Sequence, residues 1–273
     1  MDYLVNTHGL CVTRACSGAG LSRSAWYRPL KNRLESDQPL IEALQTLAEE
    51  KPGLGFWKLY RRLRRQGYGW NHKRVHRVYC QLKLNIRRRT KKRVPTRDPQ
   101  PLMVPLAPNQ VWSADFMSDA LYGGTRFRTF NVLDDFNREI LAIEIDTSLT
   151  SERLIRVFEQ LRTERGLPNM LRTDNGPEFL GSVFTQWCGD HGVFIDYIEP
   201  GKPNQNAYIE RFNRSYRNEV LDTWLFHNLD EVREITWHWM LEYNEERDHD
   251  GLGGLTPAEV LERANVLTFE VST

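Results

Sequence analysis

Residues 110–117 read QVWSADFM, and this stretch decides the fold class. Apolar residues alternate with small or polar ones along it, which is the period-two pattern of a β-strand. Asp115 stands inside that strand, where an ionised group costs free energy unless it is paired or binds a metal ion. The sequence therefore predicts a strand that carries a functional carboxylate.

The segments that follow this strand extend it into an α/β domain. Asn137 separates the second strand from the third, so the first three strands are expected to form an antiparallel meander. The further expected strands are residues 125–135, 138–145, 168–174 and 193–200, and the expected helices are residues 150–166, 180–191 and 206–219. Ligands of open α/β sheets gather at strand ends, so Asp115 is expected to meet residues from later segments.

Two later carboxylates complete a set of three. Asp174 follows the fourth strand in RTDNGPEF, and Glu210 lies on the last helix in NQNAYIERFNR. The intervals are 58 residues between Asp115 and Asp174, and 35 between Asp174 and Glu210. Carboxylates are hard oxygen ligands for Mg²⁺, and two such ions about 4 Å apart suit phosphodiester chemistry. We expect all three residues to be catalytic and to bind metal.

Ordinary structural interpretations compete with this one. An Asp before Asn-Gly is also a common turn, and a lone helical Glu is usually solvated. Other acids lie near the same strands and turns, namely Asp119, Asp134, Asp135, Glu178 and Asp196. Asp134-Asp135 is more typical of a hairpin turn, and Glu178 is expected to order the loop at Asp174. The order and spacing of the three acids together favour the catalytic interpretation.

Charge is distributed very unevenly along the chain. The net charge is only +1, yet residues 51–97 contain 17 Lys and Arg and no Asp or Glu. The remaining residues contain 20 basic and 36 acidic side chains. Aromatic and aliphatic residues recur at helical spacing within the basic segment, which favours a folded DNA-binding module over a solvated tail.

The basic segment is typical of a helix-turn-helix. Residues 56–66 predict one helix, Gly67-Tyr68-Gly69 a turn, and Asn71 a cap for a second helix that runs through Cys80. A smaller helix-turn-helix is expected in residues 12–28. The predicted DNA contacts are Lys73, Arg74, His76, Arg77, Arg61, Arg65, Arg88, Lys91 and Asn175.

A zinc site is the alternative for the second helix of this module. His72, His76 and Cys80 recur every four residues and share one helix face. The Cys-x-x-Cys pair that would complete such a site is absent from the sequence, so a phosphate-facing surface is favoured.

Together these motifs resemble family three of the insertion-sequence transposases, in particular its second-reading-frame product. The resemblance covers roughly residues 10–262 and includes the block PGKPNQNAYIERFNRSYRNE, the tail YNEERDHDGLGGLTPAEVL and the upstream GFWKLYRRLRRQGY. It implies an integrase core shared with retroviral integrases, and it places Arg217 near the DNA end. One departure is Asp248-His249, where the family often has Pro-His.

The predicted fold class is α/β: a ribonuclease-H-like mixed five-stranded sheet flanked by helices and preceded by small all-α helix-turn-helix modules. The predicted domains are a small helix-turn-helix segment (1–36), a basic helix-turn-helix module (37–94), a proline-rich linker (95–108), the catalytic core (109–222) and a C-terminal helical extension (223–273).

The resemblance implies a DNA transposase that cleaves insertion-element ends and transfers strands by attack of a 3′-hydroxyl on a phosphodiester. Two Mg²⁺ ions per site are expected, and Mn²⁺ is expected to substitute for them. The implied partners are double-stranded DNA of the element ends and target, further copies of the chain, and a first-reading-frame product. A nuclease of the same fold that does not join DNA, and a non-catalytic DNA-binding repressor, remain alternatives.

The four cysteines show no paired spacing, which is typical of a reduced compartment. No apolar run approaches the ~20 residues of a membrane span, and the start of the chain lacks a signal peptide pattern. We expect a bacterial cytoplasmic protein that associates with the nucleoid when it binds DNA.

Overall fold

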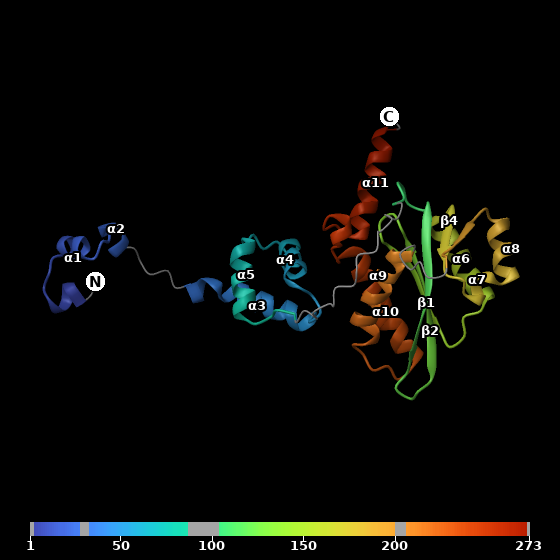
Figure 1. The fold of residues 1–273 in the computed structure, drawn as a ribbon, viewed down its shortest axis with the longest axis horizontal. Helices are drawn as coiled ribbons and strands as arrows, with labels where there is room; N and C mark the ends of the chain where they lie inside the picture. The colour runs from blue at the N-terminus through green and yellow to red at the C-terminus, as the bar shows by residue number, and fades with distance from the viewer. Residues whose placement is uncertain (1–2, 28–32, 87–103, 200–205, 272–273) are drawn as a thin grey trace. The chain divides into compact units, whose positions relative to one another are not determined.

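The computed structural model describes residues 3–27, 33–86, 104–199 and 206–271 (Figure 1). Arg88, Lys91 and most of the expected proline-rich linker lie outside these residues. The chain divides into two compact units, one of residues 1–50 and 70–84, the other of residues 51–69 and 85–273. The domain boundaries expected from the sequence stay predictions.

The first unit is helical. Its elements are the π-helix η1 (Tyr3–Thr7), α1 (Val12–Gly18), α2 (Arg23–Trp26), α3 (Arg33–Glu50) and α5 (His72–Gln81). Leu40 and Leu44 on α3 and Val75 on α5 are fully buried where these two helices pack together. The predicted cap of α5 is confirmed, because the Asn71 side chain accepts a hydrogen bond of 2.9 Å from the Lys73 backbone.

A buried acid fastens α5 to α3. Asp37 on α3 is 3% exposed and accepts hydrogen bonds from Arg74 at 2.8 Å and from Arg77 at 2.5 Å. The hydrogen bond from Arg77, followed by that from Arg74, lowers the pKa of Asp37 against the opposing effect of burial. Two arginines of the predicted recognition helix therefore hold the module together.

Replacement of Asp37 by Asn should destabilise the helical unit at pH 7, because it removes the charge that both arginines bind. The loss should be only about 1 kcal/mol, because both arginines are partly exposed and solvent screens the two ion pairs. The folded-state pKa of Asp37 is lowered, so its contribution is present above its unfolded pKa and is lost as the pH falls through the folded value. Urea unfolding followed at pH 7 and at progressively lower pH should show the gap between parent and variant closing in acid. A constant gap would contradict an electrostatic origin.

The second unit is built on a five-stranded sheet. Its strands are β1 (Val111–Ala120), β2 (Arg126–Asp134), β3 (Ile140–Asp146), β4 (Met170–Thr173) and β5 (Phe194–Tyr197), in the order β3-β2-β1-β4-β5. The pairs β1–β2 and β2–β3 are antiparallel, whereas β1–β4 and β4–β5 are parallel. The predicted mixed sheet and its opening meander are confirmed.

Helices cover both faces of this sheet (Figure 1). Trp112 and Ala114 of β1 belong to the core under α6 (Ser151–Arg165), α7 (Pro177–Leu180) and α8 (Ser182–Asp190). Met117 belongs to the opposite core under α9 (Ala207–Tyr216), the π-helix η3 (Arg217–Leu221) and α10 (Leu229–Glu245). Alternation along β1 therefore directs Asp115 toward the face that α9 covers.

The expected helix at 180–191 is interrupted at Gly181, where α7 ends and α8 begins. A Cβ at this position would lie 2.6 Å from Ser151 Oγ, so any other residue here would displace the Ser151 hydroxyl at the start of α6. The prediction of one continuous helix missed this contact because it depends on packing between distant segments.

The second unit also contains α4 (Phe56–Arg65) and the C-terminal elements η4 (Asp250–Leu252) and α11 (Pro257–Val271). Basic side chains of α4 form ion pairs with this C-terminal region: Arg61 pairs with Asp248 and Asp250, Arg62 with Glu242 and Glu246, and Arg65 with Glu259. Asp248 is only 3% exposed. Part of the basic segment therefore folds against the acidic end of the chain.

Candidate active site

Asp115 lies in the middle of β1, on the face that packs against α9. Its Oδ1 accepts a hydrogen bond of 2.8 Å from the Phe116 backbone, and its Oδ2 accepts one of 2.7 Å from Asn213 Nδ2. The carboxylate is half-buried. Its orientation is set by these two hydrogen bonds, one from the backbone of β1 and one from α9.

Asp174 directly follows β4, the parallel neighbour of β1. Its Oδ1 accepts a hydrogen bond of 3.0 Å from the Gly176 backbone. A Cβ on Gly176 would lie 3.0 Å from that same oxygen, which is tighter than ordinary contact. The glycine of the Asn-Gly pair therefore leaves room for the Asp174 carboxylate beside the turn.

Glu210 lies in the first turn of α9 and is exposed. Its neighbours Ile209 and Phe212 are buried in the core between α9 and the sheet. These apolar anchors fix the rotation of α9 and leave Glu210 at the edge of the face that carries Asp115.

The three carboxylates influence one another electrostatically. The pKa of Asp115 is raised to about 6, first by burial and also by the charges of Asp174 and Glu210, against the lowering effect of hydrogen bonds from Phe116 and Asn213. Within the described residues, however, no three His, Cys, Asp or Glu side chains converge closely enough to hold a metal ion. The three acids share a neighbourhood without forming a closed ligand set.

Arginines neutralise the competing acids of this region. The ion pairs are Asp119–Arg217, Asp134–Arg165, Asp135–Arg172, Glu178–Arg128 and Asp196–Arg172. Asp134 and Asp135 also end β2 and open its turn, as predicted. Across residues 104–199 and 206–271, by contrast, no ion pair joins Asp115, Asp174 or Glu210 to a basic side chain. This difference separates the three predicted site residues from their neighbours.

Sequence reasoning missed two amides beside Asp115. Asn213 donates to Asp115, and Asn131 Nδ2 donates to Asn213 Oδ1 at 2.7 Å. Asn213 stands three residues after Glu210 on the same helix, so its spacing was an available signal. Asn131 offered a weaker one, as a single amide within the apolar strand segment FNVL.

The predicted DNA contacts on α5 fall into two groups. Arg74 and Arg77 are held by Asp37, whereas Lys73 and His76 are exposed. In the zinc alternative, His76 and Cys80 approach each other, with Sγ 3.7 Å from Nε2. No metal-binding group involving them is present within the part of the chain that the structure describes.

The remaining predicted DNA contacts make contacts within the chain. Arg61 and Arg65 are ion-paired as described above. Arg217 donates to Asp119 at 3.1 Å and to the Ser118 carbonyl at 2.8 Å. Asn175 is exposed and donates to the Ile198 carbonyl at 3.1 Å. A DNA-binding role for each of them stays a prediction.

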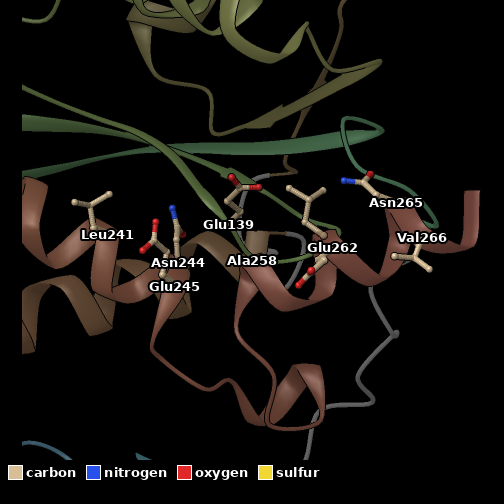
Figure 2. A pocket seen from close by; sticks show the side chains of 9 residues that line it. Glu139, Leu241, Asn244, Glu245, Ala258, Glu262, Asn265 and Val266 are labelled. Atoms are coloured by element: carbon tan, nitrogen blue, oxygen red, sulfur yellow. The ribbon is translucent and has the colours of Figure 1, made fainter. Parts of the chain in front are cut away.

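A separate pocket of about 420 Å³ lies along α10 and α11 (Figure 2). Glu139, Glu245 and Glu262 line it, and Figure 2 shows their carboxylates beside the apolar Leu241 and Val266. None of the predicted site residues contributes to it. Its acidic lining contains no Lys or Arg and would repel DNA phosphates.

Among the helices of the described residues, none has the length and apolar character to cross a membrane.

Comparisons with known protein families agree with this architecture. Residues 105–203 and 191–257 match two family descriptions, both named integrase core domain, and residues 35–93 match an HTH-like domain. The last match covers α3, α4 and α5, the helices of the predicted basic module.

Curated relatives cover most of the chain. The insertion element IS407 uncharacterized 31.7 kDa protein of Burkholderia multivorans is 39% identical over 90% of this chain and 88% of its own length. The transposase for insertion sequence element IS629 of Shigella sonnei is 27% identical over 56% of this chain and 51% of its own.

A solved chain of the simian T-cell lymphotropic virus intasome, in complex with PP2A regulatory subunit B56 gamma, shares the fold. Its TM-score is 0.52 at 16% identity, over 80% of this chain and 74% of that one. The extent of the match to the Burkholderia relative goes beyond a shared fold. The chain therefore belongs to the insertion-element transposases that carry an integrase core domain.

Proposed function

We propose that Asp115, Asp174 and Glu210 form the catalytic centre for strand cleavage and strand transfer at insertion-element ends. The observation that carries the proposal is that, among the described residues, these three acids form no ion pair with a basic side chain, whereas five neighbouring acids are all paired with arginine. An uncompensated group of carboxylates costs stability, and such groups cluster at functional sites.

The donor set fits divalent magnesium. Carboxylate oxygens are hard ligands, and Mg²⁺ keeps several waters, so few protein ligands suffice. The mutual repulsion that raises the pKa of Asp115 is relieved when a cation is bound between the acids. Asp115, Asp174 and Glu210 would hold the metal, with Mn²⁺ as a substitute and two ions per site. Because they do not yet converge, binding has to draw them closer.

The reaction needs no protein nucleophile. In the first step a water oxygen attacks phosphorus at the element end, the bond to the 3′ oxygen breaks, and that oxygen leaves as a hydroxyl. In the second step the oxygen of this 3′-hydroxyl attacks the phosphorus of another phosphodiester and gives up its proton. The bond from that phosphorus to its own 3′ oxygen breaks, this oxygen leaves as a new 3′-hydroxyl, and the two strands are joined. The bound metal supplies positive charge to the attacking and leaving oxygens. The protein positions the three carboxylates, which rest on a strand, a strand end and a helix.

Substitution of Glu210 by Gln should lower both cleavage and joining by at least about 100-fold, because one charged metal ligand is lost from a site of three. The substrate is a DNA duplex that carries the native element ends, in Mg²⁺ or in Mn²⁺. Glu210 is exposed, so the variant is expected to fold and to bind this DNA like the parent.

The matched control is Glu245→Gln, which neutralises an exposed helical glutamate outside the site and should keep full activity. Cleavage without joining by the parent would favour a nuclease of the same fold. DNA binding without chemistry would favour the repressor alternative or a requirement for the first-reading-frame product. A trapped covalent protein–DNA intermediate would contradict the mechanism.

We further propose that the exposed face of α5 contacts DNA phosphates and that several copies of the chain assemble on paired ends. A bacterial cytoplasmic location with nucleoid association follows from this substrate and stays a prediction. Lys73 is exposed on α5 and forms no ion pair within the described residues, whereas Arg74 is bound to Asp37. The two neighbouring cations therefore differ in their availability to a phosphate.

Lys73→Ala should weaken binding to end DNA similarly for all sequences and reduce the slope of log affinity against log salt by about 1, because one phosphate contact is lost. Fluorescence anisotropy between low and moderate salt measures this slope. The comparison is Arg74→Ala, which should lower the melting temperature because the ion pair with Asp37 is lost. Lys73→Ala should leave the melting temperature unchanged. An unaltered salt slope in Lys73→Ala would exclude this contact.

A further inference from the structure

Asn131 is a fully buried amide directly across the sheet from Asp115. The two residues are Cα partners in the antiparallel pair of β1 and β2, and their side chains share one face. Asn213 reaches down from α9 and bridges them, with hydrogen bonds of 2.7 Å on both sides. Asn131 on the strand and Asn213 on the helix thus form a series of two hydrogen bonds that ends at the Asp115 carboxylate.

The charge of Asp115 fixes the direction of this series. An ionised carboxylate only accepts hydrogen bonds, so Asn213 must present its NH₂ group to Asp115. Its Oδ1 then faces Asn131, which must present its own NH₂ group in turn. Rotation of either amide by 180° would set two acceptors or two donors against each other.

This orientation of the amides destabilises the folded state at Asn131, the residue of the series farthest from Asp115. Asn131 Oδ1 is buried and has no hydrogen-bond partner among the described residues. Such a buried acceptor loses its hydrogen bonds to water on folding without a replacement, which destabilises the folded state. An apolar side chain in this strand would avoid that cost, so stability alone does not account for the amide.

We propose that Asn131 is a positioning residue that acts through Asn213 to hold the Asp115 carboxylate in its catalytic orientation. The inference rests on the proposed function of Asp115. Outer partners of metal ligands typically influence metal affinity or activity by 10–100-fold. Asn131 touches neither substrate nor metal in this arrangement, and its effect passes through a single hydrogen bond to Asn213.

The test is Asn131→Leu in the full chain, a change that keeps the number and branching of the side-chain heavy atoms and removes the donor. We expect kcat for strand cleavage to fall about 10–100-fold with KM for DNA unchanged. We also expect the Mg²⁺ concentration at half-maximal thermal stabilisation to rise by a similar factor. The melting temperature without metal should stay within about 3 °C of the parent or rise, because the unsatisfied oxygen is removed as well.

Thr129→Val is the matched control. Thr129 lies two residues away on β2, is also fully buried, and also has a hydroxyl oxygen without a partner among the described residues. It pairs with Met117 rather than with Asp115, so its loss should change neither kcat nor the Mg²⁺ midpoint. Equal losses in both variants would mean that any change in this strand disturbs the site, and would overturn the proposal.

A double variant tests whether Asn131 acts through Asn213. Asn131→Leu combined with Asn213→Ala should be no less active than Asn213→Ala alone, since the series is already broken. Additive losses would overturn the proposal, as would parent-like kcat and Mg²⁺ midpoint in Asn131→Leu. If the parent joins no DNA even when the first-reading-frame product is present, the proposed function fails, while the Mg²⁺ midpoints still decide the role of Asn131.

Discussion

The candidate site depends on the apolar packing that covers both faces of the sheet, because this packing determines where the Asp115 carboxylate lies. Trp112 and Ala114 are fully buried on one side of β1, and a shift of one residue would turn them toward the other side. Their packing fixes the register and directs Asp115 to the face under α9. The free energy of the apolar core thereby holds an ionisable group where it would not lie by itself.

The same argument extends to the residues around Asp115. Ile209, Phe212 and Tyr216 are buried along one side of α9, which fixes how the helix rotates against the sheet. That rotation brings Asn213 to Asp115 and leaves Glu210 at the rim. Core packing therefore determines the site geometry, whereas the polar residues determine its chemistry.

Arginine pairing gives the region two classes of acid. Asp135 is fully buried, and both Ser113 on β1 and Arg172 on β4 donate hydrogen bonds to it. Because Asp135 directly follows β2, these bonds connect three strands and give the residue a structural role. Among the described residues, Asp115 accepts hydrogen bonds from an amide and a backbone N–H and forms no ion pair, and burial leaves its pKa raised to about 6. This contrast supports the proposed role of Asp115 in binding a cation.

The sequence predicted the sheet, the cap at Asn71 and the neighbourhood of the three acids, because each depends on local periodicity or on fixed spacing. It did not predict the break at Gly181 or the Asn131–Asn213 hydrogen bonds, because these depend on contacts between segments far apart in the chain. The partners of charged side chains were likewise only partly predictable. A helical wheel shows which basic side chains point away from the core of a helix, but it does not show which carboxylates they contact in the folded chain.

The basic segment illustrates this last limit. Its 17 cations predicted a folded DNA-binding module, but Arg61, Arg62 and Arg65 pair with C-terminal acids, and Arg74 and Arg77 pair with Asp37. An arginine held by a carboxylate releases no counterion when DNA binds unless that pair first breaks. The excess of acidic residues elsewhere in the chain thus has a structural role as the counter-charge of this segment. Among the described residues of this segment, fewer cations are therefore available to phosphates than the count of basic residues indicates, and Lys73, which forms no ion pair there, is one that is available.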